Sequence, residues 1–243
     1  MSYEVKYAPK TLDDVVISDP NIYKVLNEYI KYGNKKPLLI YGSYGLGKSS
    51  VARLLPSLIE GEPTPKMDIH NLDFTSVNAI RSYFNIYTQN AFGKLYKDPL
   101  YFVVDESKFK DNVANTLRTI TDELQGNIQF IFTMNDPNVL DDGLLDRFKH
   151  LHFTPTKAAD WLERIKFIVQ SEGVTTLSDA TLLRFINNQL NQCSSHRKLL
   201  EALQTFVSAV KSQTIALPAS SVVSLATPTK APAVLKSVPP TAI

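Results

Sequence analysis

Residues 38–49 most restrict the fold, because an apolar run passes there directly into the spacing G-x-x-x-x-G-K-S. Gly42, Gly47, Lys48 and Ser49 occupy the fixed positions of that spacing. Glycines let successive backbone N–H groups turn inward around a phosphate, and a following helix adds its positive N-terminal end. Lys48 can then reach the β- and γ-phosphates while the Ser49 hydroxyl ligates Mg²⁺. A glycine-containing turn can match the spacing by chance, but the strand-like run before it and the helix-like run after it favour a nucleotide site.

Length, charge and cysteine content exclude several classes of protein. The 243 residues suffice for one sizeable domain, or a domain with a small satellite. The 26 Lys and Arg residues nearly balance the 24 Asp and Glu residues, so overall charge gives no argument for or against nucleic acid. A single cysteine, Cys193, excludes an intrachain disulfide framework. The polar N-terminus is unlike a signal peptide, and no apolar run approaches the roughly 20 residues that span a bilayer. We therefore expect a cytoplasmic protein without membrane contact.

Strand-like and helix-like segments alternate through the first part of the chain. The strand-like runs are residues 38–41, 67–72, 100–104, 128–133 and 150–153. The clearest helix-like runs are residues 20–32, 51–59, 77–87 and 113–124. Strands that alternate with helices imply a parallel sheet covered on both faces. The expected fold is therefore α/β, with a five-stranded parallel sheet flanked by helices.

The pattern changes to helices alone after this sheet. Three amphipathic helices are expected, over residues 156–171, 178–190 and 195–211. Beyond Ser212 the chain is rich in Ala, Pro, Ser and Thr and keeps neither a helical nor a strand period. The predicted parts are a core over residues 1–154, a small all-helical lid domain over residues 155–211 and a flexible tail over residues 212–243.

Two neighbouring strand-like runs end in polar side chains that suit phosphate chemistry. Asp105 and Glu106 follow one of these runs. Asp105 can hold Mg²⁺ and its waters, and Glu106 can orient and deprotonate an attacking water. A strand that runs into an exposed turn gives the same pair, but beside a phosphate loop two adjacent carboxylates argue for hydrolysis over mere binding. Asn135, with Thr133 as the second choice, is the candidate for a group beside the γ-phosphate if the two strands are neighbours.

These ordered segments resemble the AAA+ ATPases, and in particular the core of sliding-clamp loader small subunits of the replication factor C and phage type. The opening KYAPKTLDD at residues 6–14 resembles the family segment that lies near the adenine. Residues 42–49 and 103–106 match the Walker A and Walker B motifs. Residues 132–135 resemble the sensor-1 segment, residues 144–148 the segment with a trans-acting arginine, and residues 195–200 the sensor-2 segment of the lid.

The resemblance implies roles for individual residues. It places Asn135 at the γ-phosphate, Arg147 at the ATP of a neighbouring subunit and Arg197 at the ATP from the lid. Asp146 can hold Arg147 in an ion pair until that neighbour docks. The implied nucleotide-binding residues are Tyr7, Pro9, Gly42, Ser43, Tyr44, Gly45, Leu46, Gly47, Lys48, Ser49, Ser50 and Arg197. The implied catalytic residues are Lys48, Glu106, Asn135 and Arg147, with Ser49 and Asp105 at Mg²⁺.

The chain also departs from the family pattern. Ala8 replaces the arginine of the opening motif, and Ser107 stands where the family usually has alanine after the two carboxylates. Asp-Arg-Phe at residues 146–148 replaces Ser-Arg-Cys. The Pro/Ala-rich tail does not resemble the collar domain that holds a clamp-loader ring together. Two interpretations follow: a truncated or minimal loader, or a divergent AAA+ branch that shares the core.

The resemblance implies an Mg²⁺-dependent ATPase that works in an oligomer of AAA+ subunits, at replication sites or the nucleoid, and loads a sliding clamp onto double-stranded or primed DNA. The candidate DNA contacts are Thr75, Ser76, Asn78 and Arg81, with Lys108 and Lys110 as a second group. Such contacts to phosphates bind without reading sequence. Two alternatives are a DNA-associated AAA+ regulator (a helicase loader, or a transposition or defence ATPase) and a nucleotide-gated scaffold with little turnover.

Overall fold

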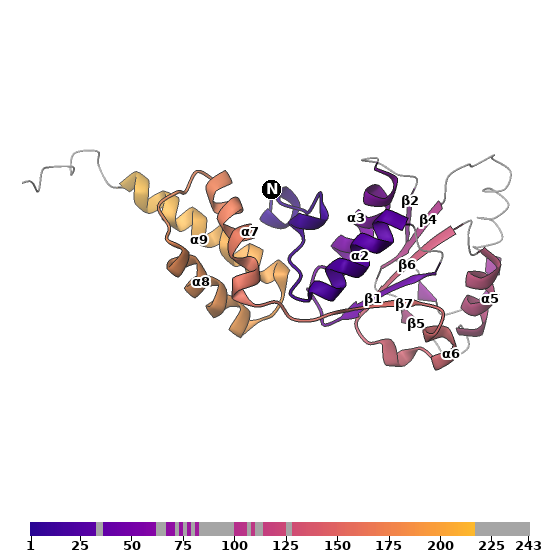
Figure 1. The fold of residues 1–243 in the computed structure, drawn as a ribbon. Coiled ribbons are helices and arrows are strands. Elements are labelled where there is room, and N and C mark those ends of the chain that lie inside the picture. Colours follow the sequence, from indigo (N-terminus) through magenta and orange to yellow (C-terminus); the bar gives the residue numbers. More distant parts are fainter. Residues whose placement is uncertain are drawn as a thin grey trace, which may run out of the picture.

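A sheet with helices on both faces and a cluster of three long helices make up the protein in this computed structural model (Figure 1). The structure describes residues 1–32, 36–61, 67–70, 73–74, 77–78, 81–82, 100–105, 108–109, 114–124 and 128–216. Among these residues, no helix is both long and apolar enough to cross a membrane.

The central sheet has five parallel strands in the order β2-β4-β6-β1-β7. They are β1 (Leu38–Gly42), β2 (Met67–His70), β4 (Leu100–Val104), β6 (Ile128–Met134) and β7 (Lys149–Phe153). The predicted α/β fold with a parallel five-stranded sheet is confirmed. The central strands are apolar at nearly every position because helices cover both faces. A second, two-stranded ribbon, β3 (Asp73–Phe74) with β5 (Lys108–Phe109), was not predicted, since two residues are too few to show a strand period.

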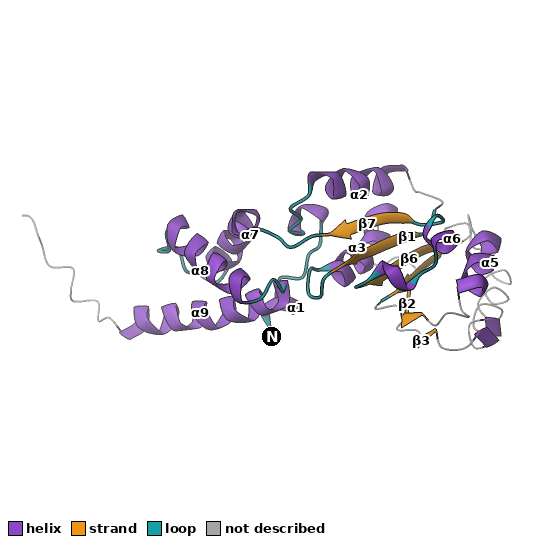
Figure 2. Ribbon diagram, turned by 90° about the horizontal axis from the view of Figure 1, so that it is seen from below, coloured by secondary structure: helices purple, strands orange, loops and turns teal. Residues whose placement is uncertain are grey.

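Alternate residues of the strands build two separate hydrophobic layers. One layer lies under α2 (Pro20–Tyr32) and α3 (Lys48–Glu60), and the other under α5 (Ala114–Leu124) and the short α6 (Asp142–Leu145). The first contains Leu26, Ile40, Leu55, Val103 and Ile131, and the second Leu39, Phe102, Leu117, Phe130 and Phe132. Figure 2 shows the strands between these helices. The sheet therefore has a complete core on each side, and the carboxyl ends of its central strands are left for a site.

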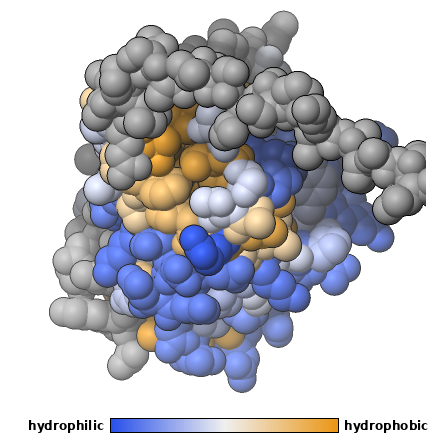
Figure 3. Space-filling model, turned by 90° about the vertical axis from the view of Figure 1, so that its left-hand side faces the viewer, coloured by the Kyte–Doolittle hydropathy of each residue, from blue (hydrophilic) through white to orange (hydrophobic). Residues whose placement is uncertain are grey.

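The helical cluster consists of α7 (Ala158–Ser171), α8 (Asp179–Gln192) and α9 (His196–Ala216), which we call the lid. Its core contains Trp161, Ile165, Ile186 and Leu203. Seen from this end, the surface shows apolar area among hydrophilic residues (Figure 3). The predicted lid helices are present, but α9 extends beyond residue 211, where the flexible tail was expected to begin. The division into core, lid and tail stays a prediction.

The N-terminal segment connects the lid with the core. Tyr3, in the short helix α1 (Tyr3–Lys6), is buried in the lid cluster, whereas Leu12 belongs to the layer under α2 and α3. The carboxylate of Glu172, just after α7, accepts hydrogen bonds from Lys6 (2.6 Å), Tyr7 (2.8 Å) and Lys211 (2.7 Å). These contacts, first of all that of Lys211, lower the pKa of Glu172 to about 2. Residues 3–7 are thus fixed to the lid.

Candidate nucleotide site

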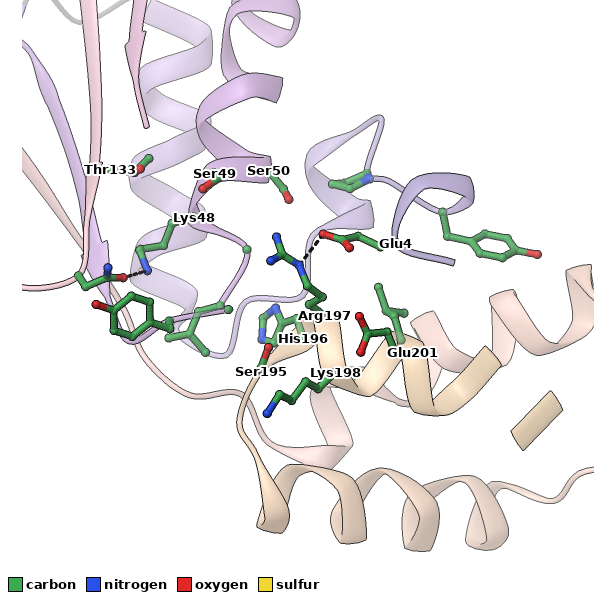
Figure 4. A pocket seen from close by; sticks show the side chains of 18 of the residues that line it. Glu4, Lys48, Ser49, Ser50, Thr133, Ser195, His196, Arg197, Lys198 and Glu201 are labelled. Carbon is green, nitrogen blue, oxygen red and sulfur yellow. Dashed lines mark hydrogen bonds and ion pairs between the residues drawn. The ribbon is translucent and has the colours of Figure 1, made fainter. Parts of the chain in front are cut away.

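A cavity of about 370 Å³ lies between the sheet and the lid. Its walls come from the N-terminal segment, the loop that leads into α3, the end of β6 and the start of α9 (Figure 4). The predicted nucleotide-binding residues that line it are Tyr7, Pro9, Tyr44, Gly45, Leu46, Gly47, Lys48, Ser49, Ser50 and Arg197. Gly42 and Ser43 do not line it, and they contribute backbone carbonyls to the site instead.

The ammonium group of Lys48 is fixed by three acceptors. It donates to the carbonyl oxygens of Gly42 (2.9 Å) and Ser43 (2.7 Å) and to Oδ1 of Asn135 (2.9 Å). The side chain is buried, since only 7% of Lys48 is exposed. These three acceptors are neutral oxygens and orient the ammonium group through hydrogen bonds. Lys48 and Asn135 therefore meet at one point of the cavity, as expected from the order of the strands.

Asp105 is the centre of a second group of polar contacts. Its Oδ1 accepts hydrogen bonds from Ser49 Oγ (2.5 Å) and Thr133 Oγ1 (2.7 Å), and its Oδ2 accepts one from Arg53 Nη2 (2.7 Å). Strands β4 and β6 are neighbours, which brings Thr133 to the carboxylate. Burial raises the pKa of Asp105, but the hydrogen bonds from Ser49 and Thr133 and the charge of Arg53 outweigh it, so the pKa lies below its ordinary value. Asp105 is an anion at neutral pH.

The role of Arg53 was not predicted from the sequence. A signal existed, because Arg53 stands four residues after Ser49 in α3, and residues at that spacing share one face of a helix. The guanidinium reaches the carboxylate from one turn further along the helix, with half of its side chain exposed. Asp105 is therefore shared by two hydroxyl groups and one cation.

The donor set of Ser49 and Asp105 fits Mg²⁺. This ion prefers oxygen ligands, in particular carboxylates beside substrate phosphates. The hydroxyl and carboxylate oxygens already lie 2.5 Å apart. When bound, Mg²⁺ supplies positive charge to the phosphate oxygens of the nucleotide. Both residues stay predicted ligands.

The lid contacts the phosphate loop directly. The backbone N–H of His196 donates to the carbonyl oxygen of Gly45 over 2.8 Å. A Cβ atom on Gly45 would stand 2.8 Å from Cβ of Ser195, closer than such atoms pack, and φ of Gly45 is +74°. A glycine is therefore needed at this position both for the turn and for the approach of the lid. Arg197, the next residue of the lid helix, has Nε 2.8 Å from Oε1 of Glu4, a cavity residue that sequence reasoning missed.

Arg147 lies away from this cavity, between α5 and α6. Its Nε and Nη2 donate to the carboxylate of Asp122 (3.0 and 2.9 Å) and its Nη1 to the carbonyl oxygen of Gly143 (2.7 Å). The predicted ion pair with Asp146 is wrong, because adjacent side chains diverge around a helical turn while Asp122 faces Arg147 from the neighbouring helix. The hydrogen bond to Asp122 raises the pKa of Arg147. Arg147 must lie outside the cavity of its own chain if it is to act on the nucleotide of another subunit.

Several predicted residues lie outside the part of the chain that the structure describes. They are Glu106, Thr75, Ser76 and Lys110. Lys108 is described only as part of β5, while Asn78 and Arg81 are exposed. The predicted helix over residues 77–87 lies mostly beyond the described ranges as well. The suggested DNA contacts stay predictions.

Comparison with known proteins gives the family of the core. Residues 38–156 match the model of the family "ATPase family associated with various cellular activities (AAA)". This stretch is an AAA domain. Curated relatives include replication factor C small subunit 1 of Pyrobaculum aerophilum, 30% identical over 179 residues that cover 72% of this chain and 54% of that protein. Replication factor C small subunit 2 of Pyrobaculum islandicum is 27% identical over 82% of this chain and 61% of its own length.

The chain spans somewhat more than half the length of the curated relatives that it matches. Among solved structures, a point mutant of Thermotoga maritima RuvB superposes with a TM-score of 0.65 at 16% identity, over 85% of this chain and 68% of that one. Another RuvB mutant from the same organism gives a TM-score of 0.64 over 84% and 67%. At this identity the likeness shows the fold alone.

Proposed function

We propose that this chain hydrolyses ATP as one subunit of an AAA+ assembly that acts in DNA replication, with sliding-clamp loading as its task. One observation carries the ATPase part: Lys48, Ser49 and Asn135 line one cavity, and Asp105, from a third segment, accepts a hydrogen bond from Ser49 beside it. An AAA domain binds a nucleotide at such a loop, so the phosphates belong beside Lys48 and the N-terminus of α3. The relatives named replication factor C small subunit support the replication part.

The proposed steps assign one task to each residue. The loop and Lys48 bind the β- and γ-phosphates, and Asn135 keeps Lys48 in place while its amide faces the reacting phosphate. Glu106, directly after Asp105, takes a proton from the attacking water. Arg147 from a neighbouring subunit stabilises the charge on the transferred phosphate, a contribution on the order of 10³ or more in rate. Hydrolysis therefore depends on assembly.

The first experiment tests hydrolysis by the purified chain. Steady-state release of phosphate is measured for the parent, Glu106→Gln and Glu163→Gln, together with binding of a fluorescent ATP analogue. Glu163 is a matched control because its side chain is 82% exposed on the lid. We expect Glu106→Gln to bind the analogue and lose turnover while the control keeps both. Equal, measurable turnover in all three proteins would contradict the proposed role of Glu106, whereas binding of the analogue without turnover in the parent would favour a nucleotide-gated scaffold.

The second experiment tests the clamp-loading part. Turnover is compared without additions, with primed DNA, and with primed DNA plus a sliding clamp. A loader shows its largest rate only when both are present, because ATP use is then coupled to closing the clamp on DNA. Stimulation by DNA alone, with no further response to a clamp, would contradict loading and favour a DNA-associated AAA+ regulator.

A further inference from the structure

His196, the first residue of α9, places its imidazole ring against the phosphate loop. The backbone N–H of His196 is held by Gly45, and the ring lines the cavity beside the loop (Figure 4). The ring atom Nδ1 lies 3.5 Å from the point where a Cβ on Gly47 would stand. Because Gly47 has no side chain, the Nδ1 edge of the ring faces the bare backbone of the loop. The proposed ATP site thus has an imidazole on its lid side.

The opposite edge of the ring determines which nitrogen carries the proton. Nε2 of His196 lies 3.1 Å from Oγ1 of Thr156, and the same Oγ1 accepts a hydrogen bond from Nε1 of Trp161 at 2.8 Å. An indole N–H can only donate, so the hydroxyl proton of Thr156 remains to be given to another acceptor. Nε2 of His196 is at hydrogen-bond distance to receive it. Leaving the proton of the buried Thr156 unused would cost about 1–3 kcal/mol.

The ring is neutral at physiological pH, which completes the assignment. Burial lowers the pKa of His196 to about 4. A neutral imidazole has one N–H and one acceptor nitrogen. With Nε2 as the acceptor of the Thr156 hydroxyl, the N–H is at Nδ1. Trp161 also packs edge-to-face on the ring, with centroids 4.8 Å apart and planes at 82°, so the ring cannot turn freely.

We infer that His196 binds the nucleotide, as a neutral hydrogen-bond donor from Nδ1 to a phosphate or ribose oxygen beside Gly47 of the loop. This inference rests on the proposed ATPase function. Thr156 is a positioning residue that acts through His196 by fixing the tautomer. The nucleotide then contacts the lid through an uncharged donor at His196 in addition to the cation of Arg197. One ring thereby joins the lid, the phosphate loop and the ligand.

The test uses substitutions that separate the two ring nitrogens. His196→Asn keeps a donor near the position of Nδ1, His196→Gln keeps only the reach of Nε2 toward Thr156, and His196→Phe keeps the packing on Trp161 without either. The dissociation constant of a fluorescent ATP analogue is measured for the full chain. We expect the Phe and Gln variants to bind about five- to tenfold more weakly, the effect of one hydrogen bond, and the Asn variant to stay within about twofold of the parent.

A spectroscopic measurement tests the tautomer without relying on affinity. Nitrogen-15 NMR distinguishes protonated from bare ring nitrogens, and the His196 signals are assigned by their loss in His196→Asn. We expect a protonated Nδ1 in the parent and a mixture of tautomers in Thr156→Val. Exposed His152 on β7 is the internal control, and we expect its signals to stay unchanged in that variant.

Failure of the inference differs from failure of the proposed function. If the parent fails to bind the analogue, as we expect of Lys48→Ala, both the inference and the proposed function are contradicted. If the parent binds and His196→Phe binds equally well, or the Asn and Gln variants lose the same affinity, only the inference is overturned. A protonated Nε2 in the parent overturns it as well. Thermal unfolding of each variant shows whether the lid remains folded, and the Asn and Gln pair gives the comparison if the Phe variant is unstable.

Discussion

The contact between Gly45 and the lid predicts how an alanine at this position affects stability, and two other glycines of the chain serve as controls. Replacing Gly45 by alanine has two costs: the left-handed φ of +74°, and a Cβ that would lie 2.8 Å from Cβ and 3.1 Å from Cα of Ser195. Gly61 and Gly173 have almost the same φ, +70° and +80°, but a Cβ there meets nothing within 4 Å. Alanine at Gly61 or Gly173 therefore measures the backbone cost alone, about 1–2 kcal/mol.

At Gly45 the same substitution must also push the start of α9 away from the loop. The hydrogen bond from the His196 N–H to the Gly45 carbonyl is then lost, which adds about 1 kcal/mol. The expected total is about 2–3 kcal/mol for Gly45→Ala against about 1–2 kcal/mol for Gly61→Ala. For a chain of this size, a difference of 1 kcal/mol corresponds to about 2–4 °C in melting temperature.

The assay is thermal and urea unfolding of the three alanine variants, together with binding of a fluorescent ATP analogue. Only Gly45→Ala is expected to weaken binding as well as stability, since only there does the lid move from the loop. Ser195→Gly in the same chain removes the contacting Cβ and should restore part of both losses. Equal losses in all three variants, or no rescue by Ser195→Gly, would refute the reasoning that the lid is docked through this glycine.

Three further predictions concern ion pairs. The pKa of Glu172 is lowered to about 2, so the ionised carboxylate stabilises the fold above its ordinary value of 4.5 and loses this stabilisation as the pH falls toward 2. The urea midpoints of Glu172→Gln should therefore vary less across that pH window than those of the parent. Arg53→Gln should reduce the free energy of unfolding at pH 7 by only about 1 kcal/mol, because Asp105 keeps its two hydroxyl donors. Arg53→Lys should reduce it less, and urea unfolding of both variants measures the difference. Asp122→Asn should leave the urea midpoint nearly unchanged, because its ion pair with Arg147 is exposed. It should alter how the ATPase rate depends on protein concentration, and an unchanged dependence would separate Asp122 from the trans site.

The helices and strands with clear signals in the local sequence were predicted. Helix α2 has its predicted bounds because Asp19 and Pro20 mark its start, and the Asp19 carboxylate indeed accepts from the backbone of Asn21. Strands β1, β4 and β6 were predictable because they are apolar at nearly every position, whereas β2 and β7 alternate apolar residues with Asp or His. The end of helix α9 was predicted too early, because the segment that begins at residue 212 shows no helical period in its sequence.

At the candidate site, the sequence led to the residues within each motif but not to the contacts between distant ones. Lys48, Ser49, Asp105 and Asn135 meet as expected, because parallel strand ends share one edge of the sheet. The partnership of Glu4 with Arg197 links residues nearly two hundred positions apart through the packing of α1 on the lid, and no periodicity encodes it. Such contacts arise from tertiary docking, which single-sequence patterns do not report.

The N-terminal segment gives the lid a second attachment to the core. The chain crosses between the two bodies once at residues 8–11, after the part fixed by Glu172, and again between β7 and α7. The chain therefore joins the lid to the core at two places, and Arg164 of α7 adds a contact to Asp14, which follows the first crossing. Pro9 lies in one tether and also lines the cavity. The segment that carries the chain from the lid to the core is thus also part of the cavity wall, which couples the position of the lid to the shape of the site.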